Sequence, residues 1–431
     1  MKKIFGVLLL MIIAVAYAAA ETKLTYDGLA RGRYEYHSNL IDAGYTGKDE
    51  KSFFRFKFLA GITADFDEWV SACFRMGTES RSFIYNAGGS TEYNVNEFFI
   101  DNLYVKIPYF MDVLELKAGR MDLPISEYGE GFLIADGTPL DGSRTWYFNA
   151  IKAKFLLGEN KTSTVEFIGI YNPRVDDVLP VINQNTPPTP LNDSLETGFV
   201  VYGRTGDKDK LYFEPYYMYK HEDAAQGGRL EEDVHTFGSY MKYTLNDVAV
   251  LRCQGAMQIN NYGREINTAF GGYVFTDFSL GMLNPLSIGY AYLSGNDPDT
   301  LGAEGWNPLF SRYPWMSEAV GYLYRYESGL LYWTNLQICK ADLNISLSKE
   351  LKILLSGALL YANETVDNAS AIYPMFGEGK NRGTLAGAKV SYVFSKYVSS
   401  YILCEYFKPG DFYFSKAKDL VFARIELAAK L

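Results

Sequence analysis

Basic side chains alternate with large apolar side chains in several short segments of this 431-residue chain. In the clearest case, Arg55 and Lys57 alternate with Phe54, Phe56 and Phe58. Successive side chains of a β-strand point to opposite faces, so this spacing predicts a strand with one charged and one apolar face. The basic residues that the alternation places on such charged faces are Arg31, Arg33, Arg55, Lys57, Arg75, Arg144, Lys152 and Lys154.

The chemistry that such faces permit is the attraction of anions inside a water-filled lumen. A charged side chain facing lipid at the bilayer midplane would cost about 2–4 kcal/mol, so we expect these residues to point inward. A lumen lined by Arg and Lys is anion-selective, and the planar guanidinium of Arg can donate two parallel hydrogen bonds to a carboxylate. A second interpretation is that the basic residues pair with Glu35, Glu79 and Glu166 and only keep the wall rigid.

The strand that ends the chain indicates how these faces are arranged. Ile425 and Leu427 share one face of this strand, and Arg424 and Glu426 share the other. An open edge invites aggregation, whereas the last strand of a closed barrel pairs with the first. The sequence therefore predicts an all-β fold, a single 18-stranded antiparallel transmembrane β-barrel. Its predicted strands are 24–38, 51–66, 69–82, 93–107, 112–120, 143–157, 162–171, 197–205, 210–221, 233–244, 247–261, 266–279, 285–294, 331–347, 350–362, 381–396, 397–408 and 417–431.

The connections between these strands alternate in length, which predicts short periplasmic turns and long extracellular loops. The segment Ser317 to Tyr326 also has strand character, but it would make a nineteenth strand, and bacterial barrels have even numbers. We therefore place it in a folded loop. The short connections are 66–68, 108–111, 157–161, 207–210, 348–350 and 395–396, and the long ones are 121–142, 172–196, 294–329 and 363–380.

The first residues have the pattern of a secretory signal peptide. Lys2 and Lys3 precede an apolar run that ends in small residues before Glu21, and the run is too short for a spanning helix. We expect a signal peptide at 1–20, Sec-type export, and a mature barrel at 21–431 in a bacterial outer membrane. Without Lys2 and Lys3, 39 basic residues stand against 51 acidic residues, a net charge of −12. We expect no nucleic-acid partner.

Three segments have a combination of residues that is typical of one protein family. They are Gly119-Arg120 with Gly131 to Arg144, Leu293 to Thr300 with Gly305 to Phe310, and Glu405 to Tyr413. In this order they resemble the alginate-export family of outer-membrane proteins. The resemblance implies an 18-stranded barrel with an Arg-rich lumen that passes an anionic polyuronate outward. It adds Arg120 to the basic lining and supports Arg144. Strict alternation would put Arg120 on the apolar face of its strand, so it reaches the lumen only where the strand ends or bulges.

Other functions are open at this stage. The first expectation is passive passage of an anionic polysaccharide or oligosaccharide. The alternatives are a general diffusion porin for small acidic solutes and a surface adhesin or structural barrel. The expected partners are outer-membrane lipid, an anionic polysaccharide and periplasmic delivery proteins, and the barrel is expected to be monomeric.

Catalytic and metal chemistry have little support in the sequence. The chain has only three His and no nucleophile elbow, His-Glu-x-x-His or P-loop, so we expect no enzyme. We expect no cofactor, although Asp297 and Asp299 could hold a divalent cation or simply lie in a solvated loop. The four Cys lie far apart without metal-ligand spacing. We expect them to be packing residues, with a disulfide as the alternative.

Overall fold

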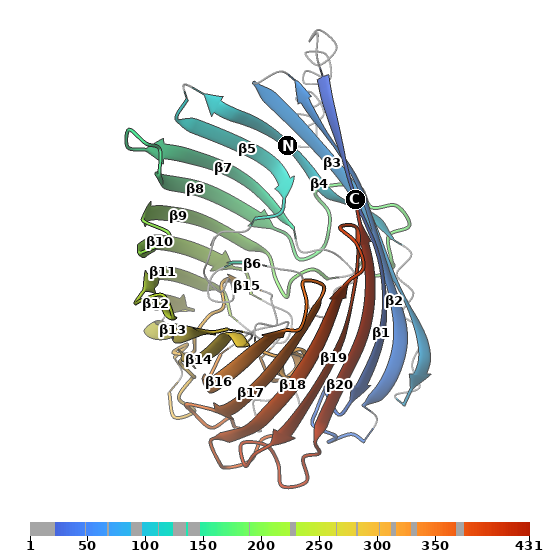
Figure 1. The fold of residues 1–431 in the computed structure, drawn as a ribbon. Coiled ribbons are helices and arrows are strands. Elements are labelled where there is room, and N and C mark those ends of the chain that lie inside the picture. Colours follow the sequence, from blue (N-terminus) through green and yellow to red (C-terminus); the bar gives the residue numbers. More distant parts are fainter. Residues whose placement is uncertain are drawn as a thin grey trace.

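Eighteen antiparallel strands form one closed β-barrel in the structure, which is a computed structural model (Figure 1). The strands are β1(Thr22–Ser38), β2(Glu50–Phe66), β3(Val70–Asn86), β4(Phe98–Phe110), β5(Leu114–Met121), β7(Phe148–Leu157), β8(Ser163–Asn172), β9(Glu196–Gly206), β10(Leu211–Glu222), β11(Glu232–Thr244), β12(Ala249–Tyr262), β13(Glu265–Leu280), β14(Leu283–Leu293), β16(Leu336–Ser346), β17(Leu351–Tyr361), β18(Asn381–Val393), β19(Val398–Pro409) and β20(Leu420–Lys430). The structure describes residues 22–47, 49–66, 69–87, 97–110, 112–123, 135–136, 147–188, 190–224, 230–263, 265–281, 283–300, 302–311, 316–328, 334–367 and 375–431. The predicted signal peptide lies outside these residues.

The pairing of β1 with β20 closes the barrel. The two strands are antiparallel and in register from Leu29–Lys430 to Ser38–Val421, while β1 pairs along its other edge with β2. Closure gives the backbone N–H and C=O groups of the terminal strands partners on both sides. The predicted pairing of the last strand with the first is therefore confirmed.

Each predicted strand corresponds to a strand of the barrel, and the main errors are at the strand starts. The strands β4, β7 and β16 begin at Phe98, Phe148 and Leu336, about five residues later than predicted. Apolar and aromatic residues also occur just before these strands in the sequence, so the predicted strands begin too early. Side-chain alternation does not reveal where the neighbouring strand ends and pairing stops.

The connections alternate in length as predicted. One end of the barrel has short turns, such as Asp207 to Lys210, and the other has long connections, such as 173–195 and 294–335. We call these the short-turn end and the long-loop end. The link between β12 and β13 is an exception, because it is short although it lies at the long-loop end.

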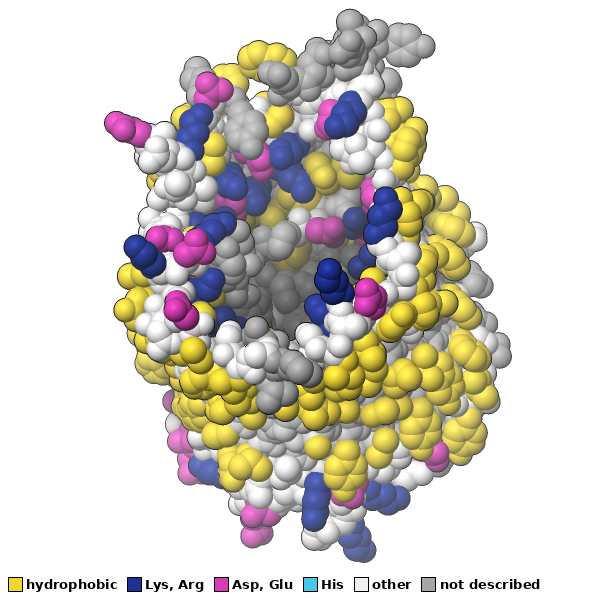
Figure 2. Space-filling model, in the orientation of Figure 1, with side chains coloured by type: hydrophobic (Ala, Val, Ile, Leu, Met, Phe, Trp, Pro, Cys, Tyr) yellow, Lys and Arg dark blue, Asp and Glu magenta, His cyan; other side chains and the backbone are white. Residues whose placement is uncertain are grey.

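The outer and inner faces of the wall differ in polarity. Phe54, Phe56 and Phe58 are exposed, whereas Arg55 and Lys57 on the opposite face of β2 are 1% and 2% exposed. Figure 2 shows hydrophobic side chains over the outer surface and Lys, Arg, Asp and Glu side chains around and inside the opening. Among the described residues, no helix has the length and apolar character to cross a membrane. The four Cys are free.

The long connection 294–335, which we call the inward loop, folds into the barrel. It carries the short strand β15(Phe310–Ser311) and the helix α2(Glu318–Ser328). The strand β15 pairs in parallel with β6(Ala135–Asp136) of the connection between β5 and β7, inside the ring of strands in Figure 1. The placement of Ser317 to Tyr326 in a folded loop is confirmed, and its described residues from Glu318 onward are helical.

Candidate functional site

The lumen wall carries a row of three arginines on neighbouring strands. Arg81 on β3, Arg55 on β2 and Arg33 on β1 are direct cross-strand partners, and Glu426 on β20 continues the row. Partners in antiparallel register lie on the same face of a sheet, so these side chains gather on one patch of the lumen. We call this set the arginine row.

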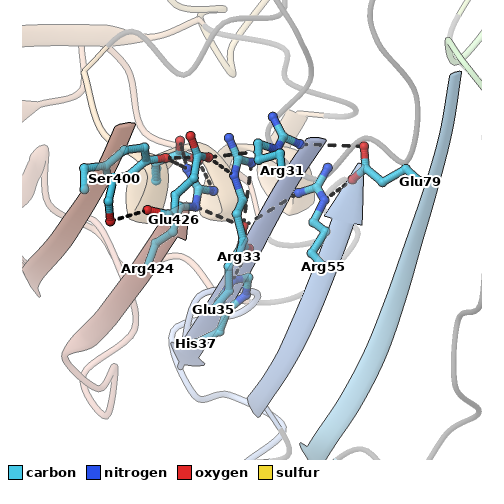
Figure 3. A network of polar contacts seen from close by, with 11 residues as sticks. Arg31, Arg33, Glu35, His37, Arg55, Glu79, Ser400, Arg424 and Glu426 are labelled. Atoms are coloured by element: carbon cyan, nitrogen blue, oxygen red, sulfur yellow. Dashed lines mark hydrogen bonds and ion pairs between the residues drawn. The ribbon is translucent and has the colours of Figure 1, made fainter. Parts of the chain in front are cut away.

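Carboxylates from the same strands hold most of these arginines in place (Figure 3). The Arg55 Nε donates to Glu79, and the Arg33 Nε donates to Glu426. Arg55 and Glu79 are almost completely buried. A charge-assisted hydrogen bond to a fixed partner occupies the donors that a passing anion would use. These contacts match the second interpretation, in which Glu79 pairs with basic residues.

Arg31 is held less tightly than the arginine row. Its Nη2 lies 3.8 Å from a Glu79 oxygen and its Nε lies 3.9 Å from a Glu426 oxygen. Both nitrogens are buried, and neither makes a hydrogen bond. The guanidinium therefore has electrostatic partners on both sides but keeps unused donors within the lumen wall.

A second basic row lies on β4, β5 and β7. Lys106, Lys117 and Lys152 are consecutive cross-strand partners. Lys106 pairs with Glu115 at 2.8 Å, and Lys152 pairs with Glu166 at 3.0 Å. We call Lys106, Lys117 and Lys152 the lysine row.

Four lysines on the lumen face form no ion pair within 4.0 Å with any residue that the structure describes. Lys117 lies 3.7 Å from the ring centroid of Tyr104, and an aromatic face satisfies a cation without neutralising its charge. The four unpaired lysines are Lys57, Lys117, Lys154 and Lys389.

Arg75 is surrounded by acids. Its Nε donates to Asp101, its Nη2 lies 2.7 Å from Asp122, and its Nη1 lies 3.8 Å from Asp27. It faces the lumen as predicted, but three carboxylates share its charge.

Arg120 lies where β5 departs from regular geometry. The preceding residue, Gly119, has a φ of 130°, a conformation that favours glycine. Arg120 is 1% exposed, and its Nη1 and Nη2 donate to the two carboxylate oxygens of Asp176 at 3.0 and 2.7 Å. Asp176 belongs to the connection between β8 and β9. The contacts fit an anchor for that connection, and a role for Arg120 in a solute pathway stays a prediction.

The remaining predicted residues divide between described and undescribed parts of the chain. Lys152 and Lys154 lie on the lumen face of β7, while Arg144 lies outside the described residues. Asp297 accepts a hydrogen bond from the Asp299 backbone N–H at 2.9 Å, the geometry of a turn. A cation at these two residues stays a prediction.

Several lumen cations were missed by the prediction, although Lys117 alternates with Leu114, Leu116 and Ala118 and could have been found from this signal. Arg382 is the most buried of these, and it precedes Gly383, whose φ is 134°. As at Gly119, an irregular strand turns a large Arg into the barrel. The cations missing from the predicted lining include Arg81, Lys106, Lys117, Arg204, Arg252, Arg382 and Lys389.

The helix α2 is attached to the inner wall at its first turn. Arg424 on β20 binds Glu318 through Nη1 and Nη2, at 2.6 and 3.1 Å. On β19, Glu405 accepts hydrogen bonds from the Ser317 hydroxyl and the Ala319 N–H, both at 2.8 Å. A carboxylate at a helix N-terminus is stabilising because it meets unpaired N–H groups and the positive end of the helix dipole.

The other end of the helix is attached to β18. Arg382 Nη1 lies 2.7 Å from Glu327, and both side chains are 2% exposed. The Tyr413 hydroxyl donates to the second oxygen of Glu327, also at 2.7 Å. The helix is thus fixed at both ends by charged groups to the inner face of β18, β19 and β20.

The preceding part of the inward loop is fixed to the opposite wall. Trp306 and Leu309 are fully buried, and the Leu309 carbonyl accepts a hydrogen bond from Lys220 of β10 at 2.5 Å. Asn307 exchanges two backbone hydrogen bonds with the Gln258 side chain of β12, at 2.8 and 2.9 Å. The loop therefore crosses the lumen and is held on both sides.

Comparison with solved structures gives the relatives of this fold. The barrel is similar to OccAB1 from Acinetobacter baumannii, with a TM-score of 0.63 and 12% sequence identity over 95% of this chain and 96% of that chain. The outer membrane protein OprD from Pseudomonas aeruginosa gives a TM-score of 0.57 and 12% identity, covering 95% and 93%. The likeness is one of fold.

A third structure, OpdK from Pseudomonas aeruginosa with vanillate, gives a TM-score of 0.56 and 11% identity, covering 95% of this chain and 98% of that chain. No family model and no curated protein sequence matches the chain. The resemblance to the alginate-export family therefore gains no support.

Proposed function

We propose that this chain is an outer-membrane porin through which small acidic solutes diffuse passively. The closed wall with an apolar outer face and a charged inner face supports this proposal, because only such a wall separates lipid from a water-filled lumen. We choose acidic solutes because four lysines on the lumen wall form no ion pair among the described residues. They are Lys57, Lys117, Lys154 and Lys389.

The mechanism that follows is electrostatic. No carboxylate of the described residues lies within 4.0 Å of these lysines, so each keeps more of its positive charge than a lysine in an ion pair and attracts an anion. Passage requires that such contacts be several and weak, since a single strong site would retain the solute. The lysines lie on four strands, β2, β5, β7 and β18. An anion can therefore leave one lysine and bind another as it moves through the lumen.

The inward loop favours small solutes over a polymer, so the first expectation from the sequence gives way to its alternative. The helix α2 is fixed to β18, β19 and β20, and the segment around Asn307 is fixed to β12. A polyuronate chain would need this loop to leave the lumen, whereas a small carboxylate only needs to pass beside it.

The location of the protein is part of the same proposal. The fold supports an outer membrane, with the long-loop end outside and the short-turn end in the periplasm. Export by a signal peptide at 1–20, a monomeric barrel and delivery proteins in the periplasm stay predictions.

Solute flux into liposomes tests the proposal. We expect a small dicarboxylate to enter faster than a neutral sugar of equal size through the purified barrel, and oligouronates to be excluded as their length grows. Lys349→Gln and Lys396→Gln, in turns at the short-turn end, serve as charge controls that leave these rates unchanged. Equal rates for the acid and the sugar would contradict the choice of solute. Passage of long oligouronates as fast as short ones would favour polymer export as the function instead.

A further inference from the structure

The connection between β1 and β2, residues 39–49, contains two buried carboxylates. Asp42 is 1% exposed and Asp49 is 5% exposed. The neighbouring Leu40 and Ala43 are fully buried in the same hydrophobic cluster as residues of α2. The connection thus packs against the rest of the protein, and this takes both carboxylates out of water.

Each carboxylate uses only one of its two oxygens. Asp42 Oδ2 accepts a hydrogen bond from the Thr46 N–H at 3.0 Å, and Asp49 Oδ2 accepts one from the Ile41 N–H. Asp42 Oδ1 and Asp49 Oδ1 are buried and have no hydrogen-bond partner. Buried charges in proteins are normally paired or bound to a metal, so two such oxygens require an explanation.

The two carboxylates lie close enough to affect each other. Burial, and then the negative charge of Asp42, raise the pKa of Asp49 to about 6. The Ile41 N–H and the Lys51 ammonium oppose this shift without cancelling it. The Asp49 carboxylate accepts its hydrogen bond from Ile41, the residue before Asp42, so the two acids lie close together in the folded connection.

We propose that the connection 39–49 binds one divalent cation of the calcium type between the free oxygens of Asp42 and Asp49. Calcium and magnesium take oxygen ligands, and backbone carbonyls or water would complete the coordination. No group of three or more His, Cys, Asp or Glu suited to a metal occurs among the described residues. The two carboxylates of the proposed site offer oxygen ligands without a thiolate or an imidazole, which disfavours a zinc-type site.

The cation fastens two loops at the long-loop end. Asn39 Nδ2 donates to the Asp419 carbonyl at 2.8 Å, and the Lys418 N–H donates to the Ala43 carbonyl at 2.8 Å. These bonds join the β1–β2 connection to the β19–β20 connection. A ligand that binds the folded connection and not the open one stabilises the closed form by mass action.

Equilibrium dialysis with radioactive calcium tests the site on the full-length barrel in detergent. We expect one site in the wild type and at least about tenfold weaker binding in Asp42→Asn and in Asp49→Asn, since each loses a charged ligand. Asp297→Asn with Asp299→Asn is the matched control and keeps the site. Retained binding in both Asp42→Asn and Asp49→Asn would overturn the proposal, as would its loss in the control.

Hydrogen exchange of the 39–49 backbone at one fixed pH tests whether the cation holds the connection closed. We expect calcium to increase protection relative to chelator in the wild type and to have no effect in Asp42→Asn or Asp49→Asn. Equal protection of the wild type with calcium and with chelator would overturn the proposal.

Discussion

Several lysines of this lumen differ from most of its arginines in having no carboxylate within 4.0 Å among the described residues. Arg33, Arg55 and Arg424 each bind a carboxylate of the wall or of α2, whereas Lys57 and Lys117 have no such partner among the described residues. Removing one partner of a buried pair leaves an uncompensated charge, so the arginines stabilise the wall as well as contributing charge. The lysines can be replaced with less structural effect.

Replacing single unpaired lysines should therefore weaken the interaction with anions. A unit charge about 4 Å from an anion is worth about 1 kcal/mol in water, so Lys57→Gln or Lys117→Gln should weaken block by a small dicarboxylate roughly fivefold. The measurement is the inhibition of single-channel current in a planar bilayer. Lys349→Gln controls for total charge. An unchanged block in both lumen variants would show that these lysines do not interact with the passing anion.

The sequence revealed only part of this lining. Arg55, Lys57, Lys152 and Lys154 could be predicted because apolar residues alternate with them along their own strands. The arginine and lysine rows could not, because a row consists of one residue from each of several strands. Its alignment depends on cross-strand register, which is set by turns and packing.

A substitution at Gly119 tests whether the backbone conformation of β5 requires a glycine. Its φ of 130° disfavours any side chain, and a Cβ there would overlap the Leu103 carbonyl oxygen. We expect Gly119→Ala to lower the stability of the end of β5 by about 1–3 kcal/mol. The hydrogen bonds from Arg120 to Asp176 should weaken as a result. Hydrogen exchange of the connection 173–195 would report this change. Gly169→Ala, where a Cβ meets no atom within 4 Å, is the control, and equal behaviour of the two variants would refute the argument.

Among the elements, the helix α2 is the one that sequence patterns describe least well. Its residues Val320, Tyr322 and Tyr324 favour strands, and the alternation around them resembles a barrel strand. Tertiary contacts override this propensity. Glu405 and Ser317 satisfy the first turn, and Arg424 and Arg382 bind acids near the two ends. None of these partners is close to the helix in sequence except Ser317.

Breaking the attachment of α2 should widen the lumen. Glu327→Gln leaves the buried Arg382 without its charged partner, a change that typically costs 3–5 kcal/mol, and Glu318→Gln weakens the attachment to Arg424. We expect each variant to show a larger or more variable single-channel conductance, with the double variant the largest. The turn variant Glu350→Gln is the control. Conductance equal to wild type in the double variant would show that α2 does not limit the passage.

At the scale of the whole molecule, the closed barrel can be predicted from the alternation of side chains along each strand. Side-chain alternation specifies an outer and an inner face in each strand, and the terminal strand from Val421 to Leu431 requires a partner that β1 supplies. The interior depends instead on contacts between distant segments, such as the pairing of β6 with β15. This explains why the fold could be predicted while the obstruction by the inward loop, and hence the preference for small solutes, could not.

The net charge of the chain is negative, so total charge and lumen charge suggest opposite selectivities. The most direct test of the account is the reversal potential of the wild-type barrel in a planar bilayer separating two concentrations of potassium chloride. Unpaired lysines along the passage should make chloride more permeant than potassium and give the potential the sign of an anion-selective channel. A reversal potential with the sign of a cation-selective channel would contradict it.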